Sequence, residues 1–175
     1  MAQRSDSLAG HMSGVLSGDN IGRALLGGVV GTAAFTVLAY AGPLMGFPRM
    51  DIATMLGTMI VSDPAGAFWP GMAMHFMIGL ILALGYAALF ASWLPGAPWL
   101  RGAIYGLVPW AMAMVVVMPM MAVVHPLVVA GMMPAPGFFL LGMGTVMAPL
   151  GSLIGHLVYG AVVGAIYGRV QRDRS

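Results

Sequence analysis

Long apolar stretches with almost no charge constrain this sequence more than any other feature. Of its 175 residues, 60% are hydrophobic and 7% are charged, and it has no lysine, glutamate or cysteine. So few charged side chains cannot cover the surface of a soluble domain of this size. The sequence therefore predicts an integral membrane protein. Its seven arginines then report on membrane topology and give no reason to expect nucleic-acid binding.

Four stretches are long enough to cross a bilayer, which takes about 20 residues. They lie at 21–45, 68–93, 101–124 and 148–170. Together they predict an all-α, four-helix membrane bundle forming a single domain over 21–170. Polar tails are expected at 1–20 and 171–175, the first of them flexible.

Prolines, glycines and two of the five acidic residues, Asp51 and Asp63, lie between the predicted spans. Asp51 is placed to cap a short amphipathic helix at the membrane surface, over 51–60. Pro109 and Pro119 predict kinks in the third span. Segment 125–147 is apolar but broken by prolines and glycines, which predicts a membrane-dipping or interfacial loop and argues against a fifth span.

The arginines orient these spans. With four crossings, six of the seven fall on one side of the membrane and only Arg49 falls on the other. Positively charged residues are retained on the cytoplasmic side. Both termini are therefore predicted to be cytoplasmic, in a bacterial inner membrane.

One spacing of histidine, glycine and tyrosine occurs twice. The residues are His75, Gly79 and Tyr86 in the second span and His156, Gly160 and Tyr167 in the fourth, 81 positions later. A shift of 78 positions also superposes Arg23 on Arg101. The chain is therefore predicted to consist of two tandem two-helix repeats in the same orientation, related by an axis along the membrane normal. That axis places the two histidines at similar depth in the outer leaflet.

Glycine recurs every four or five residues along the fourth span. The positions are Gly151, Gly155, Gly160, Gly164 and Gly168. On a helix they form one slowly drifting stripe that lets another backbone approach closely. With Gly79 and the two motif tyrosines, they are the predicted helix-packing residues.

Histidines inside the spans are the candidate functional residues, because ionisable groups in a bilayer are costly. His75 and His156 on facing helices could ligate a haem b iron from both sides, although only Arg49 is available on that side for the propionates. Alternatively, each is a neutral histidine that bonds a nearby hydroxyl or carbonyl and locks the two hairpins together.

Methionine suggests a further interpretation, a copper site. Most of the 18 methionines fall in the outer half of the spans or in the outer loops. Thioether and imidazole ligands suit Cu(I), whereas methionine also fills gaps in apolar helices. The candidate metal ligands are His75, His125, His156, Met72, Met118 and Met121.

Several function classes find no support in the sequence. No acidic residue falls inside a span, and no phosphate loop, HExxH or CxxC motif occurs, so an enzyme is not expected. The favoured function is a non-enzymatic accessory or assembly subunit that contacts the lipid bilayer and other membrane subunits. A copper- or haem-binding protein is the second candidate. A small transporter or channel is the third, and no polar path for it is visible.

Three features of the sequence are similar to those of a known protein family. They are the segment PRMDIATMLGTM after the first span, the paired histidines and the closing segment GHLVYGAVVGAIYG. Together they resemble a family of small uncharacterised prokaryotic four-span membrane proteins, over nearly the whole chain. The resemblance implies a respiratory accessory role beside terminal-oxidase components. It carries over no catalytic residues.

Overall fold

The computed structural model describes the backbone of residues 18–172 and the side chains of residues 18–168. Four helical segments are long and apolar enough to cross a membrane: Gly18–Met45, Pro64–Phe90, Pro98–Val124 and Met147–Gly168. They confirm the prediction of an all-helical, multi-pass membrane protein with four spans. The predicted tails lie mostly outside the described residues, and their positions 18–20 and 171–172 belong to helices.

Most spans combine an ordinary α-helix with a segment of different hydrogen bonding. The first is α2 (Gly18–Ala41) with the 3-10 helix η1 (Gly42–Met45), and the second is α4 (Pro64–Gly85) with the π-helix η2 (Tyr86–Phe90). The third is α5 (Pro98–Met112), the π-helix η3 (Ala113–Val117) and α6 (Met118–Val124), and the fourth is α8 (Met147–Arg172).

Proline explains the irregular hydrogen bonding in the third span. Pro119 has no N–H, and its ring would clash with the carbonyl four residues earlier in a regular helix. The chain widens just before it, where the Met118 N–H bonds to Ala113 O, five residues back. The third span therefore continues past this proline through a π-helical turn.

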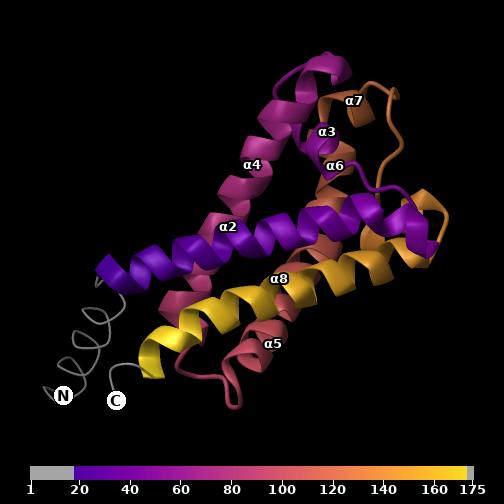
Figure 1. Cartoon of the computed structure of the whole chain (residues 1–175). Helices are drawn as coiled ribbons and strands as arrows, with labels where there is room; N and C mark the ends of the chain where they lie inside the picture. The colour runs from indigo at the N-terminus through magenta and orange to yellow at the C-terminus, as the bar shows by residue number, and fades with distance from the viewer. Residues whose placement is uncertain (1–17, 173–175) are drawn as a thin grey trace, which may run out of the picture.

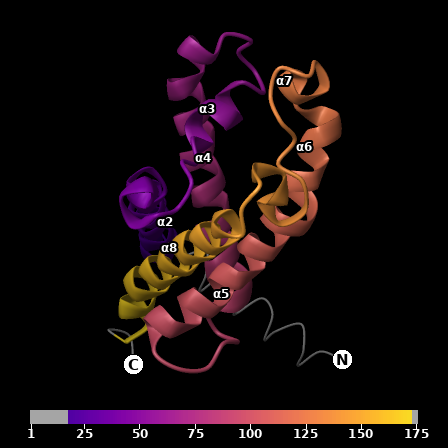
Figure 2. The same ribbon diagram turned by 90° about the vertical axis from the view of Figure 1, so that its right-hand side faces the viewer.

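The helices are arranged around the pair α2 and α8. These two contact each other and run in opposite directions, so that α2 begins and α8 ends at the same end of the molecule (Figure 1). Helix α5 contacts α8 along its length, whereas α4 contacts α2. Figure 2 shows α4 and α6 standing apart at the opposite end, called here the loop end because the long connections lie there.

Short helices occupy the loop end: α3 (Ile52–Gly57), α7 (Pro126–Val129) and the 3-10 segment η4 (Phe138–Met143). Segment 125–147 contains only α7, η4 and the start of α8, so it holds no helix long enough to be a fifth span. Within η4, Phe139 and Leu140 have positive φ of 51° and 56°, which costs a non-glycine residue free energy. Leu140 is nevertheless buried, so packing holds this turn in place.

Small residues join α3 to α4. A Cβ on Gly57 would overlap Ala67 O, and one on Gly71 would overlap Ala53 O. The face of α3 that packs on α4 is therefore its small-residue face. The larger apolar residues predicted to face the membrane surface point elsewhere, and Ile52, Met55 and Leu56 line a cavity.

The glycine stripe of α8 contacts two different neighbours. Cβ atoms on Gly160 and Gly164 would overlap Gly102 O and Pro98 O of α5, and one on Gly168 would overlap Pro98 itself. Nearer the loop end, the stripe faces aromatic rings. There Gly151 lies against Phe47, and Gly155 against Phe35.

The contact between α2 and α8 uses glycines from α2. Cβ atoms on Gly27 and Gly31 would lie 3.3 Å from Val163 Cα and 3.0 Å from Tyr159 O. Motif residue Gly79 of α4 faces Thr32 of α2. Two of the α2 glycines and one of α4 thus bring three spans close together.

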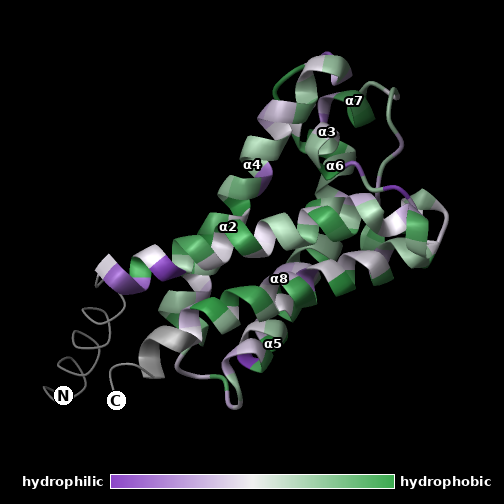
Figure 3. Cartoon of the chain, viewed as in Figure 1, coloured by the Kyte–Doolittle hydropathy of each residue, from purple (hydrophilic) through white to green (hydrophobic). Residues whose placement is uncertain are grey.

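Figure 3 shows mostly hydrophobic residues along the four spans in this view, with hydrophilic residues near the beginning of α2. At that same end, the buried rings of Tyr86, Tyr105 and Tyr167 form a cluster. The centroid of Tyr86 lies 5.2 Å from that of Tyr105 and 5.9 Å from that of Tyr167. The two motif tyrosines therefore meet in the core, whereas the two motif histidines lie nearer the loop end.

Candidate functional site

The two motif histidines come together around one phenylalanine. His75 of α4 and His156 of α8 both contact Phe35 of α2, with ring centroids 5.5 Å and 4.9 Å away. Gly155 makes this possible, because a Cβ there would lie 2.7 Å from Phe35 Cε2. Three spans thus bring both imidazoles to one place.

A hydrogen bond sets the tautomer of His156. Its Nδ1 lies 2.8 Å from the backbone oxygen of Ser152, one turn earlier in α8. A carbonyl oxygen can only accept, so Nδ1 carries the proton. Since an apolar span favours the uncharged imidazole, Nε2 holds a lone pair. Both described hydrogen bonds of this ring are made by Nδ1, with Ser152 O and, at 3.4 Å, Ser152 Oγ.

His75 has an unsatisfied nitrogen. Its Nε2 is buried and has no hydrogen-bond partner among the described residues. A buried polar atom without a partner costs about 1–3 kcal/mol. The protein retains this polar ring beside Phe35 despite that cost.

A cavity of about 420 Å³ opens beside the two histidines. It lies between α4 on one side and η3 and α6 on the other, with α3 and η4 toward the loop end. Its wall is mainly apolar and rich in sulfur. Seven methionines line it: Met50, Met55, Met112, Met114, Met118, Met133 and Met143. Its volume falls within the range of small-molecule sites, about 300–1,000 Å³.

Most other polar groups near the histidines already bond within the protein. Tyr159 donates its hydroxyl proton to Gly79 O at 2.5 Å, and Thr32 donates to Gly28 O at 2.7 Å. Both side chains line the cavity. The lone pair on His156 Nε2 is therefore an acceptor that no described hydrogen bond uses, and the buried Nε2 of His75 is a second polar atom of this region without a described partner.

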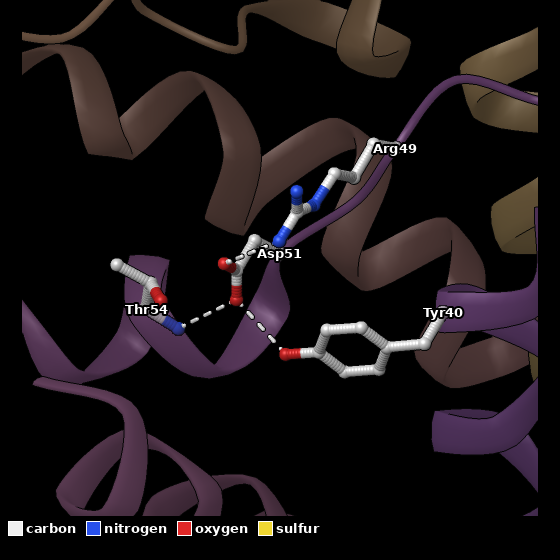
Figure 4. A network of polar contacts seen from close by, with 4 residues as sticks. All are labelled: Tyr40, Arg49, Asp51 and Thr54. Atoms are coloured by element: carbon white, nitrogen blue, oxygen red, sulfur yellow. Dashed lines mark hydrogen bonds and ion pairs between the residues drawn. The ribbon is translucent and has the colours of Figure 1, made fainter. Parts of the chain in front are cut away.

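Two charged residues, Arg49 and Asp51, line the cavity at the loop end, and Figure 4 shows their polar contacts. Asp51 Oδ1 accepts hydrogen bonds from Tyr40 Oη at 2.9 Å and from the N–H of Thr54 at 3.0 Å. Arg49 Nη2 lies 3.9 Å from Asp51 Oδ2, and the Arg49 side chain is 75% exposed. Burial alone would raise the pKa of the Asp51 carboxyl, but these hydrogen bonds and the Arg49 charge hold it below its usual value. Asp51 is therefore ionised at neutral pH.

His125 has a different role from the other two histidines. It is fully buried, and its Nε2 lies 3.0 Å from Met55 O and 3.2 Å from Thr58 Oγ1. These contacts join the junction of α6 and α7 to α3. Its Nδ1 is also buried and has no partner among the described residues. His125 does not line the cavity.

The structure divides the predicted metal ligands into two groups. His75, His156 and Met118 line one cavity. The others lie outside its wall, namely Met72, Met121 and His125. Within the part of the chain that the structure describes, no three His, Cys, Asp or Glu side chains lie close enough together to hold a metal ion.

Sequence reasoning found the two histidines but missed Phe35 and Ser152. The Ser152 carbonyl has a sequence signal, because a histidine four residues later on a helix can donate back to it. Phe35 carries no such signal, since its position depends on how α2 crosses α8. Met112 and Met114, in the middle of the third span, are not among the candidate ligands, yet both line the cavity.

Comparisons with known proteins assign no activity to the chain. No curated protein and no solved structure matches the chain. One family model covers residues 18–175, which includes every helix of the described part of the chain and both motif histidines. The chain therefore belongs to the family of unknown function DUF6789.

Proposed function

We propose that this protein is a non-enzymatic membrane protein that binds an apolar small molecule in the cavity beside His75 and His156. The observation that carries the proposal is the cavity itself, about 420 Å³ with a mainly apolar, methionine-rich wall. Apolar pockets with a few convergent polar groups are the usual form of a ligand site. The His156 lone pair supplies such a group.

The size of the cavity favours an organic molecule over a metal ion. A single copper ion bound by His75, His156 and Met118 would leave most of 420 Å³ unfilled. Methionine sulfur also makes favourable contacts with aromatic rings, and its flexible side chain adapts to the shape of a ligand. Copper and haem b stay predictions that metal analysis and a visible spectrum of the purified protein would test.

The accessory-subunit role also stays a prediction, and ligand binding is compatible with it. A subunit of a larger membrane complex can hold a ligand that the complex uses. The tandem repeat would give such a site a simple origin, since each repeat contributes one histidine to it. The two histidines meeting at Phe35 support that origin.

The proposal is tested by binding in lipid nanodiscs of dioleoylphosphatidylcholine, with para-bromoheptylbenzene as a quencher of tryptophan fluorescence. Ala113 lines the cavity, whereas Ala111 is exposed on the same span and does not line it. Ala113→Phe should abolish saturable quenching, because the larger side chain fills the site. Ala111→Phe should leave it unchanged.

Ala135 also lines the cavity and lies in the connection before α8, so Ala135→Phe provides a second way to fill the site. It keeps the test valid if Ala113→Phe fails to fold. Quenching that does not saturate, or that is equal in all variants, would show partition into lipid and contradict the proposal.

A further inference from the structure

We propose that the cavity selects apolar ligands that carry a hydroxyl group, with a phenol as the best fit, and that His156 Nε2 accepts the hydroxyl proton. This inference rests on the proposed function. It goes further by naming the polar group that the ligand must have and the atom that recognises it.

The argument begins with the backbone of α8. The 2.8 Å contact between Nδ1 and Ser152 O requires a proton on Nδ1. Because the partner is a main-chain carbonyl within the same helix, no side-chain change elsewhere is needed to set this tautomer. The ring therefore presents an acceptor on its far side, at Nε2.

An acceptor discriminates between ligands by what they donate. A hydroxyl can donate to Nε2, whereas a ketone, ether or ester oxygen cannot and would place one lone pair against another. Thr32 and Tyr159 already donate their hydroxyl protons to backbone oxygens. Neither is therefore free to donate to a carbonyl ligand, and a proton on the unpartnered His75 Nε2 would serve the oxygen of a phenol and of an ether alike.

The wall of the cavity favours an aromatic ring in the ligand. Phe35 offers its ring beside both imidazoles, and seven methionines line the remaining wall. Edge and face contacts with aromatic rings suit both kinds of side chain. A ring bearing one hydroxyl thus satisfies both the apolar wall and the acceptor on His156 beside Phe35.

The test compares para-heptylphenol with para-heptylanisole, which differ only in the methylation of the oxygen. Affinities are measured by equilibrium dialysis against nanodiscs with and without protein, so that partition into lipid is subtracted. Wild-type protein should bind the phenol about three- to tenfold more tightly, as expected for one hydrogen bond. His156→Phe should bind both compounds with the weaker, anisole-like affinity.

Thr36→Val is the matched control, because it removes a hydroxyl next to Phe35 on α2 from a residue that does not line the cavity. It should keep the preference for the phenol. A preference that survives in His156→Phe would overturn the assignment of Nε2. A different outcome is that wild-type protein binds both compounds equally and that Ala113→Phe abolishes the binding of both. That result would overturn the inference and leave the proposed function intact. No saturable binding of either compound would contradict both.

A second readout does not depend on affinity. Nitrogen-15 NMR of histidine-labelled protein should show an unprotonated Nε2 on His156, assigned by its loss in His156→Phe. That resonance should move when the phenol is added and stay in place with the anisole. A protonated Nε2 in the free protein would contradict the inference directly.

Discussion

At the scale of single residues, Asp51 combines several interactions at the loop end. Its carboxylate caps α3 through Thr54 and also accepts from Tyr40 of the first span. It therefore fixes the start of α3 to the end of α2. Arg49, in contrast, reaches the carboxylate only at 3.9 Å and is largely exposed.

This difference predicts unequal costs for removing the two charged side chains. Asp51→Ala should lower the free energy of unfolding by about 0.5–2 kcal/mol, the usual cost of losing a helix N-cap. Arg49→Ala should cost about 0–1 kcal/mol, as for an exposed ion pair. Unfolding by sodium dodecyl sulfate in mixed micelles measures both. A larger loss for Arg49→Ala would contradict the hydrogen-bond network of Figure 4.

The lowered pKa of Asp51 predicts how its contribution depends on pH. A carboxyl group whose folded pKa lies below its unfolded value, about 3.9, stabilises the protein fully above that value. The contribution is lost as the pH falls through the folded pKa. The difference in melting temperature between wild type and Asp51→Ala should therefore be constant from pH 7 to about 5 and shrink below about 4. A difference that grows on acidification would show that the pKa is raised instead.

At the scale of elements, close backbone contacts hold the spans together. The contact between α5 and α8 depends on Gly102 and Gly160 facing each other, since a Cβ on either would overlap the backbone oxygen of the other. In a bilayer, where the hydrophobic effect does not drive helices together, such contacts and interhelical hydrogen bonds provide the association. Tyr105 adds one of these bonds, donating to Leu82 O at 2.7 Å.

Gly160→Ala should therefore destabilise the bundle by about 1–3 kcal/mol, because the added methyl group forces α5 and α8 apart. Gly22 is the matched control, since it is an exposed helical glycine with nothing within 4 Å of its would-be Cβ. Gly22→Ala should be neutral or stabilise by up to about 1 kcal/mol. Unfolding titrations of both variants test this contrast. Equal effects would mean that α5 and α8 do not meet at these glycines.

A second prediction at this scale concerns His125, which connects α3 to the junction of α6 and α7. Substitution His125→Ala removes its bonds to Met55 O and Thr58 Oγ1. Amide hydrogen exchange should then accelerate in residues 52–60 and 125–130, while the α8 core keeps its protection. Faster exchange throughout the protein would indicate a global role for His125, and no change would show that the connection is not formed.

The elements also show what sequence can and cannot determine. Span number and helical class followed from length, charge and apolar content, because these properties are local to each stretch. The orientation of α3 could not be predicted from the sequence, since its contact with α4 depends on Ala53 and Gly57 meeting Ala67 and Gly71 across a turn. Large apolar side chains suggested a membrane-facing surface, whereas part of that face lines the cavity.

At the scale of the whole molecule, the divergence of α4 from α6 creates the site. Histidines could be singled out from sequence because ionisable residues are rare in spans. Their meeting at Phe35 and the cavity beside them depend on how three spans cross, which no single stretch encodes. The sequence thus identified two polar residues of the site, and the packing of the spans supplies its apolar wall.

The most direct measurement is photocrosslinking with a diazirine-bearing alkylphenol in nanodiscs, followed by mass mapping of the labelled residues. The account predicts labels on cavity residues of the second and third spans, in 75–82 and 112–118, with competition by unlabelled para-heptylphenol. Val37, Leu89 and Val123 are outward-facing residues that are 65–74% exposed. Labels concentrated on such residues, at a level that the competitor does not lower, would contradict the account.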